Sequence, residues 1–271
     1  MAGDDLSGAW NFRDVAVETG IRPGRFFRSS ELTRLDDDGR DAMVRLGITD
    51  VADLRSLSEV QKRGSGLVPD GVAVHLLPFH ELSNQAAAEG STEAPHEYAF
   101  ERMMTEKPDD EAVAVAAARF MTEEYRRFPN LAGAHLAVRQ VISMLADERP
   151  VITHCFAGKD RTGFTVAVTL AAVGVPDEAI MTDFLRSNEA VPSLRLRILE
   201  SIRNRAGEGA TDEILTFAEA QLTEEVLGVR EGYLATALHT VAEDYGSLPN
   251  YLDALGVTSE QVDRLRTNLL A

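Results

Sequence analysis

The chain has 271 residues, of which 44% are hydrophobic and 26% are charged, a balance typical of a globular protein with a sizeable core. Its formal net charge of −17 argues against non-specific binding to nucleic acid or to anionic lipid, because both need a basic surface. The single cysteine excludes an intramolecular disulfide and leaves the thiol free to react.

The N-terminus, MAGDDLSGAW, is acidic and has no basic start followed by an apolar run, so we predict no cleaved signal peptide. The longest near-apolar stretch, FTVAVTLAAVGV, is too short to cross a bilayer. We therefore expect a soluble protein with no stable membrane insertion. It would be cytoplasmic or secreted without a cleaved signal peptide, and the sequence leaves its oligomeric state open.

Short apolar runs alternate with helical patterns in the first part of the chain, which is typical of an α/β domain with a mainly parallel sheet. The strand candidates are residues 25–30, 48–55, 72–79 and 150–155. Between the first two, residues 36–47 predict a helix with an acidic first turn and a glycine stop. Apolar residues at three- and four-residue steps predict two more helices, around residues 118–128 and 138–145.

The chain continues with a predicted helix from about Thr162 to Val173, which Gly174 ends. The remainder is helical in pattern, with candidates at residues 177–188, 193–205, 212–222, 230–245 and 259–270. Residues 83–97 are polar, small and acidic, so we expect a mobile surface loop there. No repeat or clean linker divides the chain, and we predict a single domain over residues 1–271.

The segment HCFAGKDRTG, residues 154–163, holds the only cysteine at the junction between an apolar strand and a helix. Such a junction binds anions, because successive backbone N–H groups and the positive helix end converge on it. The same field favours the ionised, nucleophilic form of the Cys155 thiol. Arg161 can return across the loop and bind two phosphate oxygens through its planar guanidinium. The pattern predicts a phosphoryl-transfer site, although a lone cysteine is more often a small buried hydrophobe.

Five segments resemble the cysteine-dependent protein-tyrosine phosphatase superfamily, and in particular its bacterial tyrosine phosphatases. They are NFRDV (Asn11 to Val15), FRSSEL (Phe27 to Leu32), DLRS (Asp53 to Ser56), HCFAGKDRTG and YGSLPNYL (Tyr245 to Leu252). The resemblance covers nearly the whole chain and implies a phosphatase-type α/β fold. It also implies a helical lid over the active site, to which the helical C-terminal half would contribute.

For activity, the resemblance implies hydrolysis of phosphotyrosine, with phosphoserine, phosphothreonine and phosphoinositides as further substrates, and it implies no metal and no other cofactor. By position it makes Cys155 the nucleophile and Arg161 the phosphate clamp. The backbone amides that would cradle the phosphate are those of Phe156, Ala157, Gly158, Lys159, Asp160 and Arg161.

Three further residues in or beside the loop, Lys159, Thr162 and His154, each have two alternative roles. Lys159 adds a second positive charge that would hold an extra phosphate of a phosphoinositide, or it is a solvated charge at the rim. Thr162 donates its hydroxyl to the Cys155 sulfur, or caps the helix that follows, and both can hold together. His154 orients the loop through hydrogen bonds rather than acting as a base, because a preformed thiolate needs none.

The general acid is the point at which the chain departs from the common pattern of the superfamily. Many members use an aspartate on a separate mobile loop, but the corresponding region here reads His80-Glu81, without an obvious Trp-Pro-Asp. Asp160, beside Arg161, is the predicted acid. Asp53 ends a predicted strand, and we expect it to bind a nearby arginine.

Several basic residues stand out in this acidic chain, namely Arg22, Arg25, Arg28, Arg55, Lys62 and Arg63. They could build a positive funnel toward the site, or form a solvated face. The histidines are scattered and no zinc spacing is present, so a metal site has little support.

Other functions stay open: an inositol-polyphosphate or phosphoinositide-specific phosphatase, a sulfurtransferase, or a non-catalytic phosphate-binding module. Arg161 favours phosphoryl chemistry over sulfur transfer. A non-catalytic module would normally have lost Cys155 or Arg161, and both are present.

Overall fold

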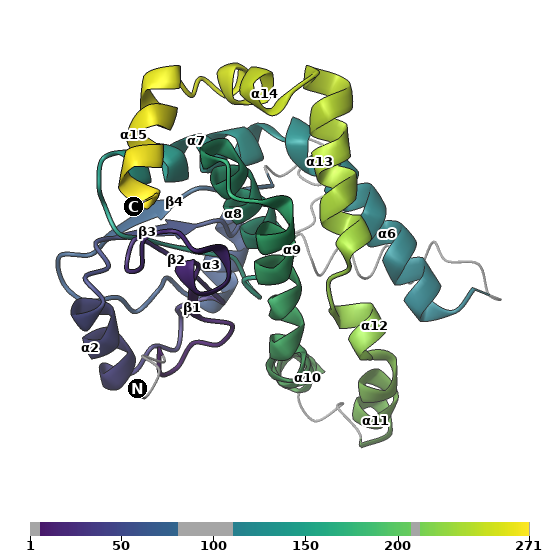
Figure 1. Cartoon of the computed structure of the whole chain (residues 1–271). Helices are drawn as coiled ribbons and strands as arrows, with labels where there is room; N and C mark the ends of the chain where they lie inside the picture. Colours follow the sequence, from purple (N-terminus) through teal and green to yellow (C-terminus); the bar gives the residue numbers. More distant parts are fainter. Residues whose placement is uncertain (1–5, 81–110, 207–211, 271) are drawn as a thin grey trace.

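The computed structural model describes residues 6–80, 111–206 and 212–270. At its centre lies a five-stranded sheet in the order β1-β2-β5-β3-β4 (Figure 1). The strands are β1 (Arg13–Asp14), β2 (Phe26–Ser29), β3 (Asp50–Asp53), β4 (Ala73–Leu76) and β5 (Val151–His154). All run parallel except β1, which pairs antiparallel with β2. The predicted α/β fold with a mainly parallel sheet is confirmed; β1, a short polar strand, was not predicted.

The three central strands are buried on both faces, and successive side chains enter different apolar cores. Phe26 and Val151 belong to the larger core, whereas their neighbours Phe27 and Ile152 belong to the smaller one. Because neighbouring residues of a strand point to opposite faces, a sheet covered on both sides needs apolar residues at successive positions. This explains why these strands appear in the sequence as short apolar runs.

Helices cover both faces of the sheet. On the smaller core lies α2 (Asp37–Arg45), which contributes Met43. On the larger core, α7 (Ala132–Ala146), α8 (Asp160–Val173) and α15 (Ser259–Leu269) pack against one another. The other helical elements are α1 (Ala16–Thr19), α3 (Leu57–Arg63), α6 (Val113–Arg127), η1 (Phe128–Asn130), α9 (Asp177–Arg186), η2 (Ser187–Ala190), α10 (Val191–Ala206), α11 (Asp212–Gln221), α12 (Glu224–Leu227), α13 (Glu231–Tyr245) and α14 (Leu248–Ala254).

The central helix α8 is enclosed almost along its whole length, with Phe164, Val168 and Leu170 fully buried. It begins at Asp160, slightly earlier than the predicted start, and ends at Gly174, whose φ of 88° is left-handed. A helix that is apolar all round must be buried. The loop that precedes α8 is therefore held deep in the molecule.

Helices of the C-terminal half extend beyond the sheet, where α10, α11 and α12 gather at one end of the molecule (Figure 1). One apolar cluster joins them to the loop after β5; it comprises Phe156, Ala157, Val191, Leu194, Leu222 and Leu227. The loop is thus covered by residues from α10, α12 and the segment before α12.

No helix in the described ranges combines the length and the apolar character that a membrane crossing requires. The surface loop predicted at residues 83–97 lies outside the described residues.

Candidate active site

The loop from Cys155 to Lys159 connects β5 to α8, and Cys155 is only 2% exposed. Gly158 has a φ of 67°, and a Cβ atom there would lie 2.1 Å from the carbonyl oxygen of Ser29. Glycine is therefore required twice, for the left-handed backbone and for the close approach to β2.

Donors outside the loop bind the carbonyl oxygens of four successive residues, Phe156, Ala157, Gly158 and Lys159. The backbone N–H of Glu31 donates to the first at 3.0 Å, and Asn11 Nδ2 donates to the second at 2.9 Å. Arg28 Nη2 donates to the third at 2.8 Å and to the fourth at 3.3 Å. Since the C=O and N–H of a trans peptide point in opposite directions, these bonds turn the loop amides to the other side. That is the arrangement an anion cradle needs.

A buried carboxylate, Asp183 of α9, fixes these anchors. Its Oδ1 accepts from Arg13 Nε at 2.7 Å and its Oδ2 from Arg28 Nη1 at 2.5 Å, while Arg13 also donates to Asn11 Oδ1 at 2.7 Å. Burial opposes ionisation of Asp183, but the two arginines outweigh it, so its pKa is lowered. Burial, together with Arg28, lowers the pKa of Arg13 to about 10. The sequence had assigned no role to Asp183.

Arg161, the second residue of α8, is buried, with 7% of its surface exposed. It donates to Glu59 through both terminal nitrogens, Nη1 at 2.6 Å and Nη2 at 2.8 Å. Burial lowers the pKa of Arg161, but Glu59 outweighs it and raises the pKa above its usual value. Glu59 is fixed in turn by a capping box at the start of α3, where Ser56 and Glu59 bind each other's backbone N–H. The spacing of Ser56 and Glu59 was the signal in the sequence that could have located this partner.

Asp160 is the first residue of α8, and hydrogen-bond donors or cations lie beside both of its carboxylate oxygens. The Tyr125 hydroxyl of α6 donates to Oδ1 at 3.0 Å, and Lys159 Nζ lies 3.3 Å from Oδ2. Lys159 Nζ also donates to the Leu227 carbonyl of α12 at 2.6 Å. In this structure the Lys159 ammonium is therefore bound between Asp160 and α12, rather than solvated at the rim of the site.

His154 ends β5 and is fully buried, and burial lowers its pKa. Its Nδ1 lies 3.1 Å from the Cys155 carbonyl oxygen, and its Nε2 lies 3.7 Å from Asp53 Oδ2. Asp53 accepts from Arg55 Nη2 at 2.7 Å, which confirms that it binds a nearby arginine. Thr162 Oγ1 is buried with no hydrogen-bond partner among the described residues, and its bond to the Cys155 sulfur during the reaction stays a prediction.

For Arg28 and Arg55 both expectations, a positive funnel and a solvated face, are wrong, because these two side chains are fully buried in ion pairs. Two carboxylates bind Arg55: Asp53 lies 2.7 Å from its Nη2 and Glu31 lies 3.3 Å from its Nη1. Glu31 also contacts Arg197 of α10 at 3.1 Å. The Arg63 guanidinium lies 4.0 Å from the centre of the Phe156 ring, so this cation borders the loop. Composition shows the charge of such residues but not their buried partners.

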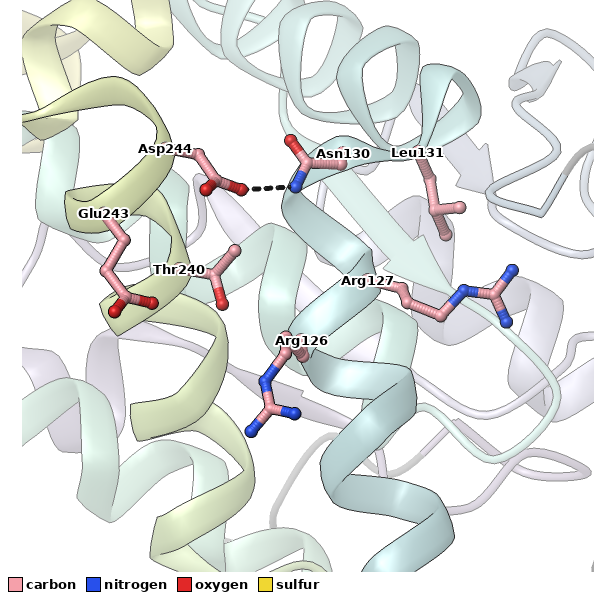
Figure 2. A pocket seen from close by; sticks show the side chains of 7 residues that line it. All are labelled: Arg126, Arg127, Asn130, Leu131, Thr240, Glu243 and Asp244. Carbon is pink, nitrogen blue, oxygen red and sulfur yellow. Dashed lines mark hydrogen bonds between the residues drawn. The ribbon is translucent and has the colours of Figure 1, made fainter.

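A pocket of about 450 Å³ lies apart from the loop, between α6 and α13 (Figure 2). It is lined by Arg126, Arg127, Asn130, Leu131, Thr240, Glu243 and Asp244. Asn130 donates to Asp244 across it at 2.6 Å, and no residue of the phosphate-binding loop lines it.

Within the described part of the chain, no group of three or more His, Cys, Asp or Glu side chains could hold a metal ion. Glu81, the alternative acid, lies outside the described residues.

Comparison with known proteins places this arrangement in context. A family model described as "Tyrosine phosphatase family" matches residues 4–271. The chain is 52% identical, over the full length of both chains, to the triple specificity protein phosphatase PtpB of Mycobacterium tuberculosis. It is 25% identical to a tyrosine-protein phosphatase of Nostoc commune, over 93% of this chain and 76% of that protein. All five segments that carried the resemblance lie within the matched range.

Proposed function

The chain belongs to the tyrosine phosphatase family and is a protein-tyrosine phosphatase, a hydrolase, and from this premise we propose that it works through a phosphocysteine on Cys155. In the first step the Cys155 sulfur attacks phosphorus. The S–P bond forms, the bond from phosphorus to the tyrosyl oxygen breaks, and Asp160 gives its proton to that oxygen. In the second step water attacks phosphorus, Asp160 takes a proton from it, and the thiolate leaves.

The observation that carries this proposal is the set of bonds that hold the four loop carbonyls outward. A cradle that is already built binds the charge of the transferring phosphoryl group without reorganising. Arg161, held flat by Glu59, is the clamp on two of its oxygens. His154, which is fully buried at the end of β5, supports the loop through the contact of its Nδ1 with the Cys155 carbonyl oxygen.

We extend the proposal to substrate range. The relative that is 52% identical over its full length is named a triple specificity phosphatase. By that likeness this chain would hydrolyse phosphotyrosine, phosphoserine and phosphothreonine, and phosphoinositides. Lys159 supports the last class, provided that it leaves the Leu227 carbonyl so that its ammonium can meet a second phosphate.

The covering helices are proposed as a lid within a single domain. Cys155 and Arg161 are both nearly buried, and Phe156 and Ala157 pack against side chains of α10 and α12. A phosphotyrosine could not reach the sulfur until these helices moved away from the loop.

Rapid mixing with 4-nitrophenyl phosphate tests the covalent step. We expect a burst of nitrophenolate equal to the enzyme concentration, and a phosphorylated Cys155 peptide after acid quenching. Cys155→Ser should abolish both while it retains binding of inorganic phosphate. A phosphorylated residue elsewhere in the chain, or full activity of Cys155→Ser, would overturn the assignment.

A panel of phosphopeptides and phosphoinositides, compared by kcat/KM, tests the substrate range. Lys159→Met should lower kcat/KM for a phosphoinositide more than for a phosphotyrosine peptide. Equal losses on both would show that Lys159 does not read the second phosphate. Activity confined to phosphoinositides would favour the alternative, a phosphoinositide-specific enzyme.

A further inference from the structure

We infer that Tyr125 is the positioning residue of the general acid: its buried hydroxyl, donating to Asp160 Oδ1, fixes the carboxyl group so that Oδ2 delivers the proton. The inference rests on the proposed function, because it requires Asp160 to be the acid. It adds a residue of α6, distant in sequence from the loop, to the machinery of the reaction.

Tyr125 is rigidly held. It is fully buried, and its ring lies 4.7 Å from that of Phe128, 5.5 Å from that of Tyr233 and 6.0 Å from that of Phe184, measured between centroids. These contacts come from η1, α13 and α9, so the ring is packed on several sides. A hydroxyl on such a ring cannot follow a moving partner, and it sets the position of the group it binds.

The direction of the hydrogen bond is also determined. Burial and the neighbouring Asp160 raise the pKa of Tyr125 well above its usual value, so the hydroxyl keeps its proton and donates. Among the described residues, Asp160 Oδ1 accepts the hydrogen bond of that hydroxyl. A protonated Asp160 would therefore carry its proton on Oδ2, because a proton on Oδ1 would face the Tyr125 donor.

The charged and titratable groups around the Asp160 carboxyl come from every side. They are Tyr125 of α6, Tyr233 of α13, Lys159 in the preceding loop, and Arg161 of α8, which also interacts with Cys155. Of these groups, the Lys159 ammonium lies beside Asp160 Oδ2 while it is bound to the Leu227 carbonyl of α12. The Tyr125 hydroxyl is the one among them that donates to Oδ1. Moving Lys159 away would free Oδ2 for the leaving group and leave the bond to Tyr125 intact.

The test compares Tyr125→Phe with Tyr233→Phe. Both changes remove one hydroxyl from the same aromatic cluster, but of the two it is the Tyr125 hydroxyl that donates to Asp160. On phosphotyrosine, Tyr125→Phe should lower kcat roughly tenfold, and on 4-nitrophenyl phosphate, whose phenolate leaves unaided, by less than about threefold. The alkaline limb of the pH–rate profile should move to higher pH, because the ionised carboxylate loses a donor. Tyr233→Phe, which removes a hydroxyl near Asp160 but not the donor to Oδ1, should keep the ratio of kcat on the two substrates near the wild-type value.

A double variant separates a positioning role from a merely structural one. If Tyr125 acts through Asp160, then Tyr125→Phe should add little to the loss caused by Asp160→Asn. A multiplied loss in the double variant, or a Tyr125→Phe that behaves like Tyr233→Phe on both substrates, would overturn the inference. Should Tyr125→Phe not fold, a fluorinated tyrosine at position 125, a stronger donor, should move the alkaline limb to lower pH; an unmoved limb would be equally decisive against it.

The same series separates this inference from the proposed function. If Asp160→Asn shows no dependence on the leaving group, Asp160 is not the acid and the proposed function fails at that point. If Asp160→Asn shows the dependence and Tyr125→Phe does not, the acid stands and only the role of Tyr125 falls.

Discussion

Glu59 and Arg161 form a buried pair in which both terminal nitrogens of the arginine donate to one carboxylate, at 2.6 and 2.8 Å. The pair fixes the plane of the guanidinium before any phosphate arrives. It also joins α3 to α8, since each residue lies near the start of its helix.

Glu59→Gln should therefore impair catalysis and stability together. The amide has one oxygen acceptor, so one nitrogen of Arg161 loses its partner and the guanidinium can tilt. We expect kcat/KM to fall on the order of 10²-fold, and unfolding free energy to fall by about 3 kcal/mol. Steady-state kinetics and urea unfolding measure the two effects. Glu123→Gln, in an exposed pair with Arg126, is the control and should be near wild type; matching behaviour of the two variants would contradict the prediction.

Asp183→Asn tests the anchor of the loop. Neutralising Asp183 leaves Arg13 and Arg28 without their shared counter-ion. The Gly158 and Lys159 carbonyls that Arg28 binds, and the Asn11 side chain that Arg13 binds, then become free to rotate. Vanadate affinity should fall roughly tenfold, with equal losses of kcat/KM on phosphotyrosine and 4-nitrophenyl phosphate. Asp177→Asn, an exposed position on the same helix, should bind vanadate normally. A loss that depends on the leaving group would assign Asp183 to proton transfer instead.

Gly158→Ala should damage the loop by two physical effects at once, the left-handed φ and the clash with Ser29. Gly47→Ala isolates the first, because Gly47 has a φ of 69° but nothing within 4 Å of an added Cβ. We expect a loss of about 1 kcal/mol for Gly47→Ala, and roughly 2 to 5 kcal/mol with loss of activity for Gly158→Ala. Thermal and urea unfolding give both values; similar losses would mean that the clash relaxes without cost.

The stability of the protein should fall as the pH drops below about 6.5, the ordinary pKa of histidine. Burial lowers the pKa of His154 in the folded state, so in this range the unfolded chain binds the extra proton. The contribution is complete above the unfolded pKa and is lost as pH falls toward the folded one. Urea unfolding at a series of pH values, compared with His154→Gln, checks this. The variant should show a shallower slope; an unchanged slope would show that His154 is not responsible.

The sequence predicts the sheet and the loop because both depend on local pattern. Each central strand holds a pair of adjacent apolar residues (Phe26-Phe27, Val51-Ala52 and Val151-Ile152), and the loop is a contiguous segment whose glycine and helix start are visible. Their relative placement follows from the rule that parallel strands bring their carboxyl ends to one edge.

The partners of the loop could not be predicted in the same way. Glu59 lies 102 residues from Arg161, Asp183 lies 155 residues from Arg28, and Tyr125 lies 35 residues from Asp160. Each is an ordinary residue in its own helix, and its role exists only once the helices pack. The burial of Arg28 and Arg55 was missed for the same reason, although Arg28 follows two apolar residues in β2 and Arg55 follows Leu54 just after β3.

The residues that anchor the catalytic loop come from segments of the chain made before and after the loop itself. Asn11 and Arg28 come from the beginning of the chain, whereas Asp183, which orients them, comes from α9. A growing chain that has just produced Cys155 and Arg161 still lacks the carboxylate that holds the loop in shape. Contacts between such distant segments form slowly, because long loops must close first. A nascent chain that ends before Asp183 lacks the carboxylate that orients Arg13 and Arg28, so we expect the anchored form of the catalytic loop only after α9 has been made.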